Sequence, residues 1–225
     1  MGKPDIIYED NNIIVCYKPA GIATQTRRIG QQDMESFIRN YRAAKNEPPY
    51  VGIVHRLDQP VEGVMVFAKN QKAAASLSRQ IKEHTTEKYY HAASRGHGVS
   101  GAAVEDEEAW HTLTDYISFD KRTNTSKITS EKDRLAKKAV LQYRVISVTP
   151  DRDSSQNECN KTEFDIKLLT GRHHQIRLQL AHIGYPLIGD TKYGGDTARE
   201  QLALCSYKIV FDHPATGERM TFELP

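Results

Sequence analysis

Residues 54–69 read VHRLDQPVEGVMVFAK, a polar segment that runs directly into an apolar one. The apolar run Val64–Ala68 has the length and the β-branched content of a buried strand, and a proline and a glycine mark a turn in front of it. Three polar side chains, His55, Arg56 and Asp58, therefore lie in a turn that leads into a core strand. A carboxylate two residues from an arginine on such a scaffold is a candidate for chemistry. An exposed ion pair is the alternative for an arbitrary Arg-x-Asp.

The length and composition are those of an ordinary globular protein. The 225 residues are 38% hydrophobic and 27% charged, which excludes a disordered chain and suffices for a substantial core in one domain over residues 1–225. The net charge of +2 does not demand a polyanionic partner, so any nucleic-acid surface must be local.

Cysteine usage and hydropathy indicate the compartment. The three cysteines are odd in number and follow no metal-ligand spacing, which favours a reduced intracellular protein. No apolar stretch has membrane-spanning length, and the first residues are no signal peptide. We therefore expect a cytoplasmic protein with no membrane partner.

Hydrophobic periodicity predicts short strands interleaved with three helices. One helix follows Asp33 and exposes a basic face that includes Arg42, and a second follows the N-cap residue Asn70. Strands are expected at residues 6–8, 13–17, 64–68, 88–94, 112–119, 139–148, 162–169, 207–211 and 220–224. We interpret the remaining long segments as a surface loop, a charged connection and a mobile hairpin tip, at residues 96–110, 120–138 and 150–160 respectively.

A second polar cluster follows the strand at residues 162–169. This strand alternates inward apolar residues with outward polar ones, as a half-buried strand does. It leads into residues 170–177, TGRHHQIR, and then into a helix that is marked by Ile176 and Leu180 and ended by Gly184. Both polar clusters therefore lie at strand boundaries.

Three segments, in order, resemble the RluA family of RNA pseudouridine synthases. They are HRLD at residues 55–58 with Gly63 and Ala68-Lys69, KYYHA at residues 88–92, and TGRHHQIR at residues 170–177 with the continuation G-x-P-x-x-G-D-x-x-Y-G at residues 184–194. The resemblance extends from KPAG at residues 18–21 to His213-Pro214. It implies an α+β fold with a large, mainly antiparallel mixed sheet, flanking helices and a central RNA-binding cleft, in a short form without an N-terminal S4 domain.

The resemblance also implies an activity and a set of site residues. Such an enzyme isomerises specific uridines in structured RNA, ribosomal or transfer, without metal or cofactor, and we expect a monomer. Asp58 matches the catalytic carboxylate, whose role as nucleophile or base stays open. Tyr90 matches the tyrosine that stacks on the target base and acts as a general base late in the reaction, and Arg177 matches the basic residue that pairs with the aspartate. Arg56 matches the arginine that helps displace the flipped nucleotide, and Arg172 is expected to contact phosphate or to be structural.

Two departures from the family pattern stand near these residues. Val61-Glu62 replaces the usual Thr-Ser, and Gln179 stands where a histidine is common. Glu62 is expected to face solvent, and the alternative is that it alters the loop geometry and the choice of substrate. His55 and Asp190 are expected to be structural and to bond their own loops.

Two other functions remain as alternatives. One is an RNA-binding or ribosome-assembly module on a synthase scaffold whose chemistry is secondary or lost. The other is a metal-dependent hydrolase that uses His55, Asp58, His173 and His174. Adjacent histidines are expected to point apart, which argues against this pair as metal ligands.

Overall fold

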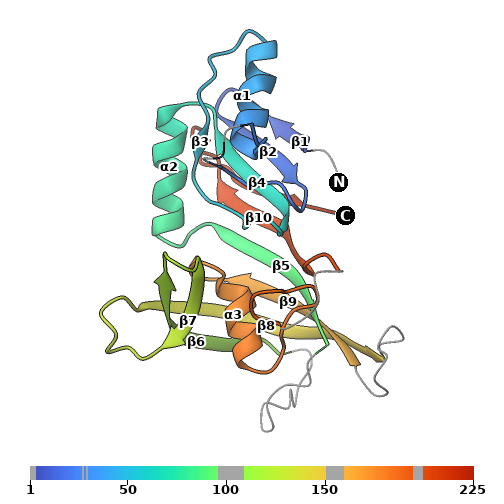
Figure 1. The fold of residues 1–225 in the computed structure, drawn as a ribbon. Coiled ribbons are helices and arrows are strands. Elements are labelled where there is room, and N and C mark those ends of the chain that lie inside the picture. Colours follow the sequence, from blue (N-terminus) through green and yellow to red (C-terminus); the bar gives the residue numbers. More distant parts are fainter. Residues whose placement is uncertain (1–3, 27, 29, 96–108, 151–159, 195–199) are drawn as a thin grey trace. The chain divides into compact units, whose positions relative to one another are not determined.

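The computed structural model describes residues 4–26, 28, 30–95, 109–150, 160–194 and 200–225. The chain divides into two compact units, one formed by residues up to Lys88 with Cys205–Pro225 and the other by Tyr89–Leu204. Each unit contains a sheet that carries helices (Figure 1). The sheet of the first unit is mixed, with one parallel pairing, and that of the second unit is antiparallel, so the predicted α+β class is confirmed. The expectation of a single domain stays a prediction.

The first unit contains a sheet in the order β1-β2-β4-β10-β11, with β3 also paired to β4. Its strands are β1 (Asp5–Glu9), β2 (Ile13–Lys18), β3 (Gly52–Ile53), β4 (Glu62–Ala68), β10 (Leu204–Asp212) and β11 (Arg219–Glu223), and its helices are α1 (Met34–Ala44) and α2 (Gln71–Lys82). The pairing of β4 with β10 is parallel, whereas β2 pairs with β4 in antiparallel register. The predicted central strand is therefore β4, buried along its whole apolar run.

The core of the first unit joins β2, β4 and β10 to one face of α2. Val15, Val66, Leu77 and Phe211 belong to this cluster, and each is almost completely buried. Asn70 caps α2 as predicted, because its side chain accepts a hydrogen bond from the Ala73 amide.

The prediction that Arg42 lies on the exposed basic face of α1 is wrong. Met34, Ile38 and Arg42 follow one another at intervals of four residues and form the buried stripe of the helix. The Arg42 guanidinium donates to the carbonyl oxygens of Tyr50 and Lys69. These bonds satisfy the buried charge. The periodicity of apolar residues could not identify this buried position, because an arginine occupies it.

The second unit contains an antiparallel sheet in the order β5-β9-β8-β6-β7. Its strands are β5 (Glu87–Ser94), β6 (His111–Asp120), β7 (Thr125–Thr129), β8 (Lys137–Pro150) and β9 (Asn160–Leu168), and α3 (Gln175–His182) is its helix. Ile117, Ala139 and Leu178 form a core cluster where α3 packs on the sheet.

Strand β7 lies in the segment that was predicted to be only a charged connection. It is five residues long and polar at most positions, so its sequence lacks the apolar alternation that marks a strand. Its pairing with β6 across a turn at Asn124, which has a φ of 51°, makes it a strand. The predictions for residues 96–110 and 150–160 lie mostly outside the described residues. None of the described helices is both long and apolar enough to span a lipid bilayer.

Candidate active site

The Asp58 turn is held against the loop that follows β2. Lys18 is fully buried, and its Nζ atom donates to the carbonyl oxygens of Pro19, Ile22 and Gln59 at 3.1, 2.6 and 3.2 Å. The Gly21 amide donates to the same Gln59 oxygen at 2.8 Å. A single ammonium group therefore joins the KPAG loop to the residue that follows Asp58.

Thr24 holds the residue that precedes Asp58. Its hydroxyl donates to the Leu57 carbonyl at 2.9 Å and accepts from the Leu57 amide at 3.1 Å. The Val61 amide donates to the Asp58 carbonyl at 3.0 Å and closes the turn. The backbone on both sides of the half-buried Asp58 is thus fixed by neighbours in its own unit, which pre-organises the carboxylate.

Glu62 is half-buried and bonded, so the expectation that it faces solvent is wrong. Its carboxylate accepts a hydrogen bond from the Tyr17 hydroxyl at 2.8 Å. Burial and then this bond raise the pKa of Tyr17 to about 12. Burial lowers the pKa of Lys18 to about 8, while the nearby carboxylates of Asp58 and Glu62 oppose that change. Glu62 lies at the start of β4, where its neighbours on β2 reach it.

His55 has a structural task, as predicted, although its partner is a strand and not its own loop. Its Nε2 atom accepts a hydrogen bond from the Val66 amide at 3.1 Å. Burial and then the charge of Lys88 lower its pKa to about 3, so the ring is neutral at physiological pH. Arg56 lies in the same turn with an exposed side chain.

Tyr90 lies on β5 in the second unit, opposite Ile166 of β9. It is buried, whereas the half-buried Tyr89 lies with its ring 5.4 Å from the Lys167 ammonium group. Successive strand residues point to opposite faces of a sheet. The two tyrosines therefore have different surroundings, and the role of Tyr90 stays a prediction.

Arg177 on α3 makes a buried bidentate ion pair with Asp190. Its Nε and one terminal nitrogen donate to the two carboxylate oxygens at 2.8 and 2.7 Å, and the side chains are 4% and 0% exposed. Asp190 also accepts from the amides of Lys192 and Tyr193 in its own loop, as predicted for a structural residue. Burial opposes the ionisation of Asp190, but the bonds from Arg177 and these amides outweigh it and lower the pKa.

Tyr193 and His174 continue this network. The Arg177 guanidinium lies over the Tyr193 ring at 5.3 Å, and the Tyr193 oxygen lies 2.9 Å from His174 Nδ1. Burial and then the charge of Arg177 lower the pKa of His174 to about 3. A neutral ring with an acceptor at Nδ1 accepts a hydrogen bond from the Tyr193 hydroxyl. The hydroxyl oxygen in turn accepts from the Ser126 amide on β7 at 2.9 Å.

The prediction that His173 and His174 point apart is wrong. Their rings stack with centroids 3.7 Å apart. His174 has a φ of 55°, which takes it out of the regular helical and extended geometries on which the prediction relied. His173 Nδ1 lies 2.9 Å from the Ser126 hydroxyl. Within the described parts of the chain, no three His, Cys, Asp or Glu side chains are grouped to hold a metal ion.

The remaining residues of this motif shape the turn before α3. The Gln175 side-chain oxygen accepts from the Thr170 hydroxyl at 2.8 Å and from the Arg172 amide at 3.0 Å. The Arg172 side chain donates through Nε to the Lys138 carbonyl at 2.8 Å. Gln179, at the position where a histidine is common, is fully buried and donates to Asp115 at 2.7 Å.

Sequence reasoning missed three residues of this network, Gln175, Tyr193 and Asp190 as the partner of Arg177. The signal was available, because Gln175 stands inside TGRHHQIR and the other two inside the Gly-Asp-x-x-Tyr pattern. The predicted pairing of Asp58 with Arg177 stays a prediction.

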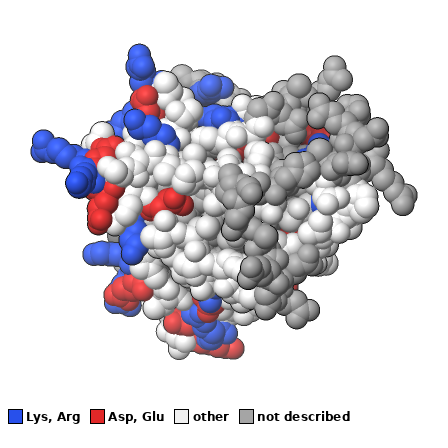
Figure 2. Space-filling model, turned by 90° about the horizontal axis from the view of Figure 1, so that it is seen from below, with Lys and Arg blue, Asp and Glu red and all other residues white. Residues whose placement is uncertain are grey.

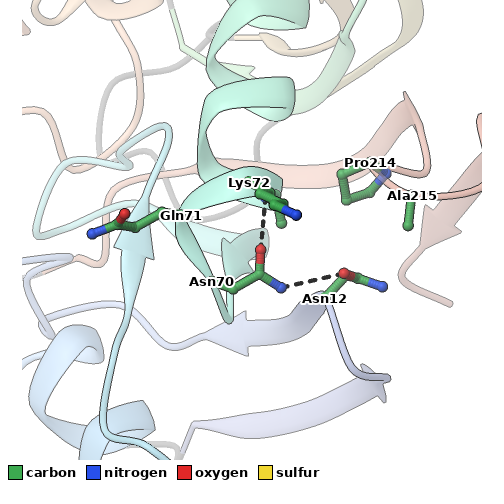
Figure 3. A pocket seen from close by; sticks show the side chains of 7 residues that line it. Asn12, Asn70, Gln71, Lys72, Pro214 and Ala215 are labelled. Atoms are coloured by element: carbon green, nitrogen blue, oxygen red, sulfur yellow. Dashed lines mark hydrogen bonds between the residues drawn. The ribbon is translucent and has the colours of Figure 1, made fainter.

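A pocket of about 450 Å³ opens at the start of α2 (Figure 3). It is lined by Asn12, Asn70, Gln71, Lys72, Ala73, Pro214 and Ala215. Asn70 bonds Asn12 at 3.2 Å and caps the helix, so these polar groups have structural partners. The pocket contains none of the predicted site residues.

Comparison with known proteins identifies the family. Residues 12–182 match the RNA pseudouridylate synthase family. The chain is 32% identical to the "Uncharacterized RNA pseudouridine synthase YhcT" of Bacillus subtilis over all of this chain and 69% of that protein. It is 34% identical to the ribosomal large subunit pseudouridine synthase D of Pseudomonas aeruginosa over 98% of this chain and 68% of that one.

A solved structure supports the same fold. Human RNA pseudouridylate synthase domain containing 1 superposes with a TM-score of 0.74 and 24% identity, covering 99% of this chain and 83% of that one. At this level of identity the likeness concerns the fold alone. Together with the sequence matches and the three motifs, it confirms the predicted resemblance: the chain belongs to the RluA-type RNA pseudouridine synthases.

Proposed function

We propose that this pseudouridine synthase isomerises specific uridines in structured RNA with Asp58 as its catalytic carboxylate. The observation that carries the proposal is the clamp on the Asp58 turn, in which Lys18 and Thr24 hold the residues on either side of it. A reacting carboxylate must be held close to its productive position, and rigid neighbours provide this.

The reaction requires few protein groups. It breaks the C1′–N1 glycosidic bond and forms a C1′–C5 bond within the same nucleotide. C5 loses its proton and N1 gains one, so the reaction is an isomerisation that consumes no co-substrate. The target uridine must leave the base stack, which costs a few kcal/mol. We assign the carboxylate chemistry to Asp58, stacking on the target base and late proton removal to Tyr90, and the role of fixed cation to Arg177.

Two arginines are assigned to RNA binding. The exposed Arg56 fills the gap left by the displaced nucleotide. Arg172 already donates through Nε to Lys138, so it contacts phosphate through its terminal nitrogens.

We further propose ribosomal RNA as the first substrate class to test, because a relative with 34% identity is named for the large ribosomal subunit. Transfer RNA is the second class. The proposed working unit is a monomer in which residues 1–225 act together.

The test is pseudouridine mapping of total RNA from cells with and without the gene, complemented by wild type, Asp58→Asn or Asp212→Asn. Asp212 lies in an exposed ion pair with Arg219 and serves as the matched control. One or a few sites should disappear without the gene and return with wild type and the control. They should not return with Asp58→Asn, although that protein folds and binds RNA. Restoration of the sites by Asp58→Asn would refute the catalytic assignment, and equal growth rescue without modification would support an RNA-binding role.

A further inference from the structure

Residues 120–138, here called the basic hairpin, concentrate positive charge. They include the end of β6, all of β7 and the start of β8. Seven Lys and Arg stand against three Asp and Glu, which gives a net charge of +4 in a chain whose total is +2. The seven are exposed, and they are Lys121, Arg122, Lys127, Lys132, Arg134, Lys137 and Lys138. The rest of the chain is therefore acidic on balance.

The acidic side chains of the basic hairpin are engaged in shaping its turns. Asp120 accepts from the Arg122 amide at 2.8 Å, and Asp133 accepts from the Leu135 amide at 2.9 Å. Glu131 accepts from the Tyr116 hydroxyl at 2.6 Å. The bonds to these amides are the largest cause of the lowered pKa values of Asp120 and Asp133. The carboxylates thus bond the backbone and a tyrosine rather than the cations around them.

The basic side chains have no comparable structural task. Across the parts of the chain that the structure describes, no ion pair includes any of the seven. Figure 2 shows Lys and Arg side chains that project into solvent from the face seen there, with Asp and Glu side chains beside them. A solvated face with interspersed signs is the ordinary surface of a protein. An unbalanced cluster attracts a polyanion instead.

The basic hairpin is bonded to the segment that carries Arg172 and Arg177. Lys192 Nζ donates to the Asn124 carbonyl at the tip of the turn at 2.7 Å. Ser126 on β7 bonds both Tyr193 and His173, and Arg172 bonds the Lys138 carbonyl on β8. The cationic surface therefore continues, through fixed contacts, to an arginine that was assigned to RNA binding from the motif alone.

We infer that the basic hairpin binds the phosphate backbone of substrate RNA beside the target uridine. The inference rests on the proposed function, since it names where the same substrate is held. Contacts of exposed Lys and Arg to phosphate position the RNA and carry no sequence information. The hairpin should therefore supply affinity and salt dependence, whereas the choice of uridine is made elsewhere.

The test compares two triple variants with identical charge changes. Lys121→Gln/Arg122→Gln/Lys127→Gln alters the hairpin, and Lys72→Gln/Arg79→Gln/Lys82→Gln alters exposed positions on α2. The probe is a labelled RNA stem-loop with uridines in the loop, and its affinity is measured between about 50 and 200 mM salt. Thermal unfolding of both variants establishes that they are folded.

In the hairpin variant, the slope of log affinity against log salt should be less steep by about 2 to 3, because each lost phosphate contact reduces the magnitude of this slope by about one. The α2 variant should bind as wild type does. With a modified RNA in hand, the loss of kcat/KM in the hairpin variant should come from KM.

Equal effects of the two variants, or no effect of the hairpin variant, would overturn the inference. Its failure is distinguishable from failure of the proposed function. An active enzyme whose hairpin variant binds RNA normally refutes the inference alone. A wild-type protein that binds RNA through the hairpin but modifies no uridine refutes the proposed function alone.

Discussion

Replacing Asp190 by asparagine should destabilise the second unit strongly. The substitution keeps the size of the side chain and one oxygen that can still accept from the Lys192 and Tyr193 amides. It removes the negative charge beside the Arg177 guanidinium, at a position where both side chains are almost inaccessible to water. The guanidinium then loses its two charge-assisted bonds to this carboxylate, and water cannot replace them.

The magnitude follows from the burial. Breaking a buried ion pair by removing one partner costs roughly 3–5 kcal/mol. In a protein of this size each kcal/mol lowers Tm by about 2–4 °C, so we expect a decrease of roughly 6–20 °C. The control is Asp212→Asn, which removes an ion pair whose side chains are 43% and 41% exposed. Exposed pairs contribute at most about 1 kcal/mol.

The assay is thermal unfolding followed by the fluorescence of Trp110. It is the only tryptophan of the chain, and it lies in the same unit as Asp190. A double variant, Arg177→Met/Asp190→Asn, should recover part of the lost stability, because no unpaired charge stays buried and the asparagine oxygen still accepts from the two amides. A decrease in Tm for Asp190→Asn no larger than that of the control would refute the reasoning.

Three further predictions concern other fixed points of the structure. Lys18→Met should cost about 3–5 kcal/mol, because the fully buried ammonium group that three carbonyl oxygens share is lost. The exposed Lys72→Met should change stability by less than about 0.5 kcal/mol. Urea unfolding followed by circular dichroism measures both, and equal values would contradict the clamp. Gly63→Ala should prevent folding, because Gly63 has a φ of 135° and a Cβ atom would lie 2.3 Å from the Ser206 carbonyl oxygen. A soluble variant with the wild-type Tm would contradict this geometry. The pKa of His174 is about 3 in the folded protein and near its ordinary 6.5 in the unfolded chain, so the unfolded state binds the extra proton and stability is lost as the pH falls from 6.5 towards 3. In His174→Asn, where asparagine tolerates the same φ, the free energy of unfolding should decline less steeply between pH 7 and pH 4. An unchanged decline would argue against a buried neutral ring.

The family and most of the regular elements could be predicted from the sequence alone. The apolar run that became β4, the alternation that became β9 and the cap at Asn70 depend on neighbours within a few residues, and local spacing encodes such features directly. The motifs also named Asp58, Tyr90 and Arg177, whose roles stay predictions.

The partners of the polar residues could not be predicted, because they depend on tertiary contacts. Glu62 was expected in solvent and bonds Tyr17, Arg42 was expected on an exposed face and is buried, and β7 became a strand through its pairing with β6. In each case the deciding partner comes from another element of the fold. A charged side chain has the same local pattern whether water or a buried carbonyl satisfies it, so the sequence does not distinguish these outcomes. Long-range packing chooses between them, and it also placed Asp190 against Arg177.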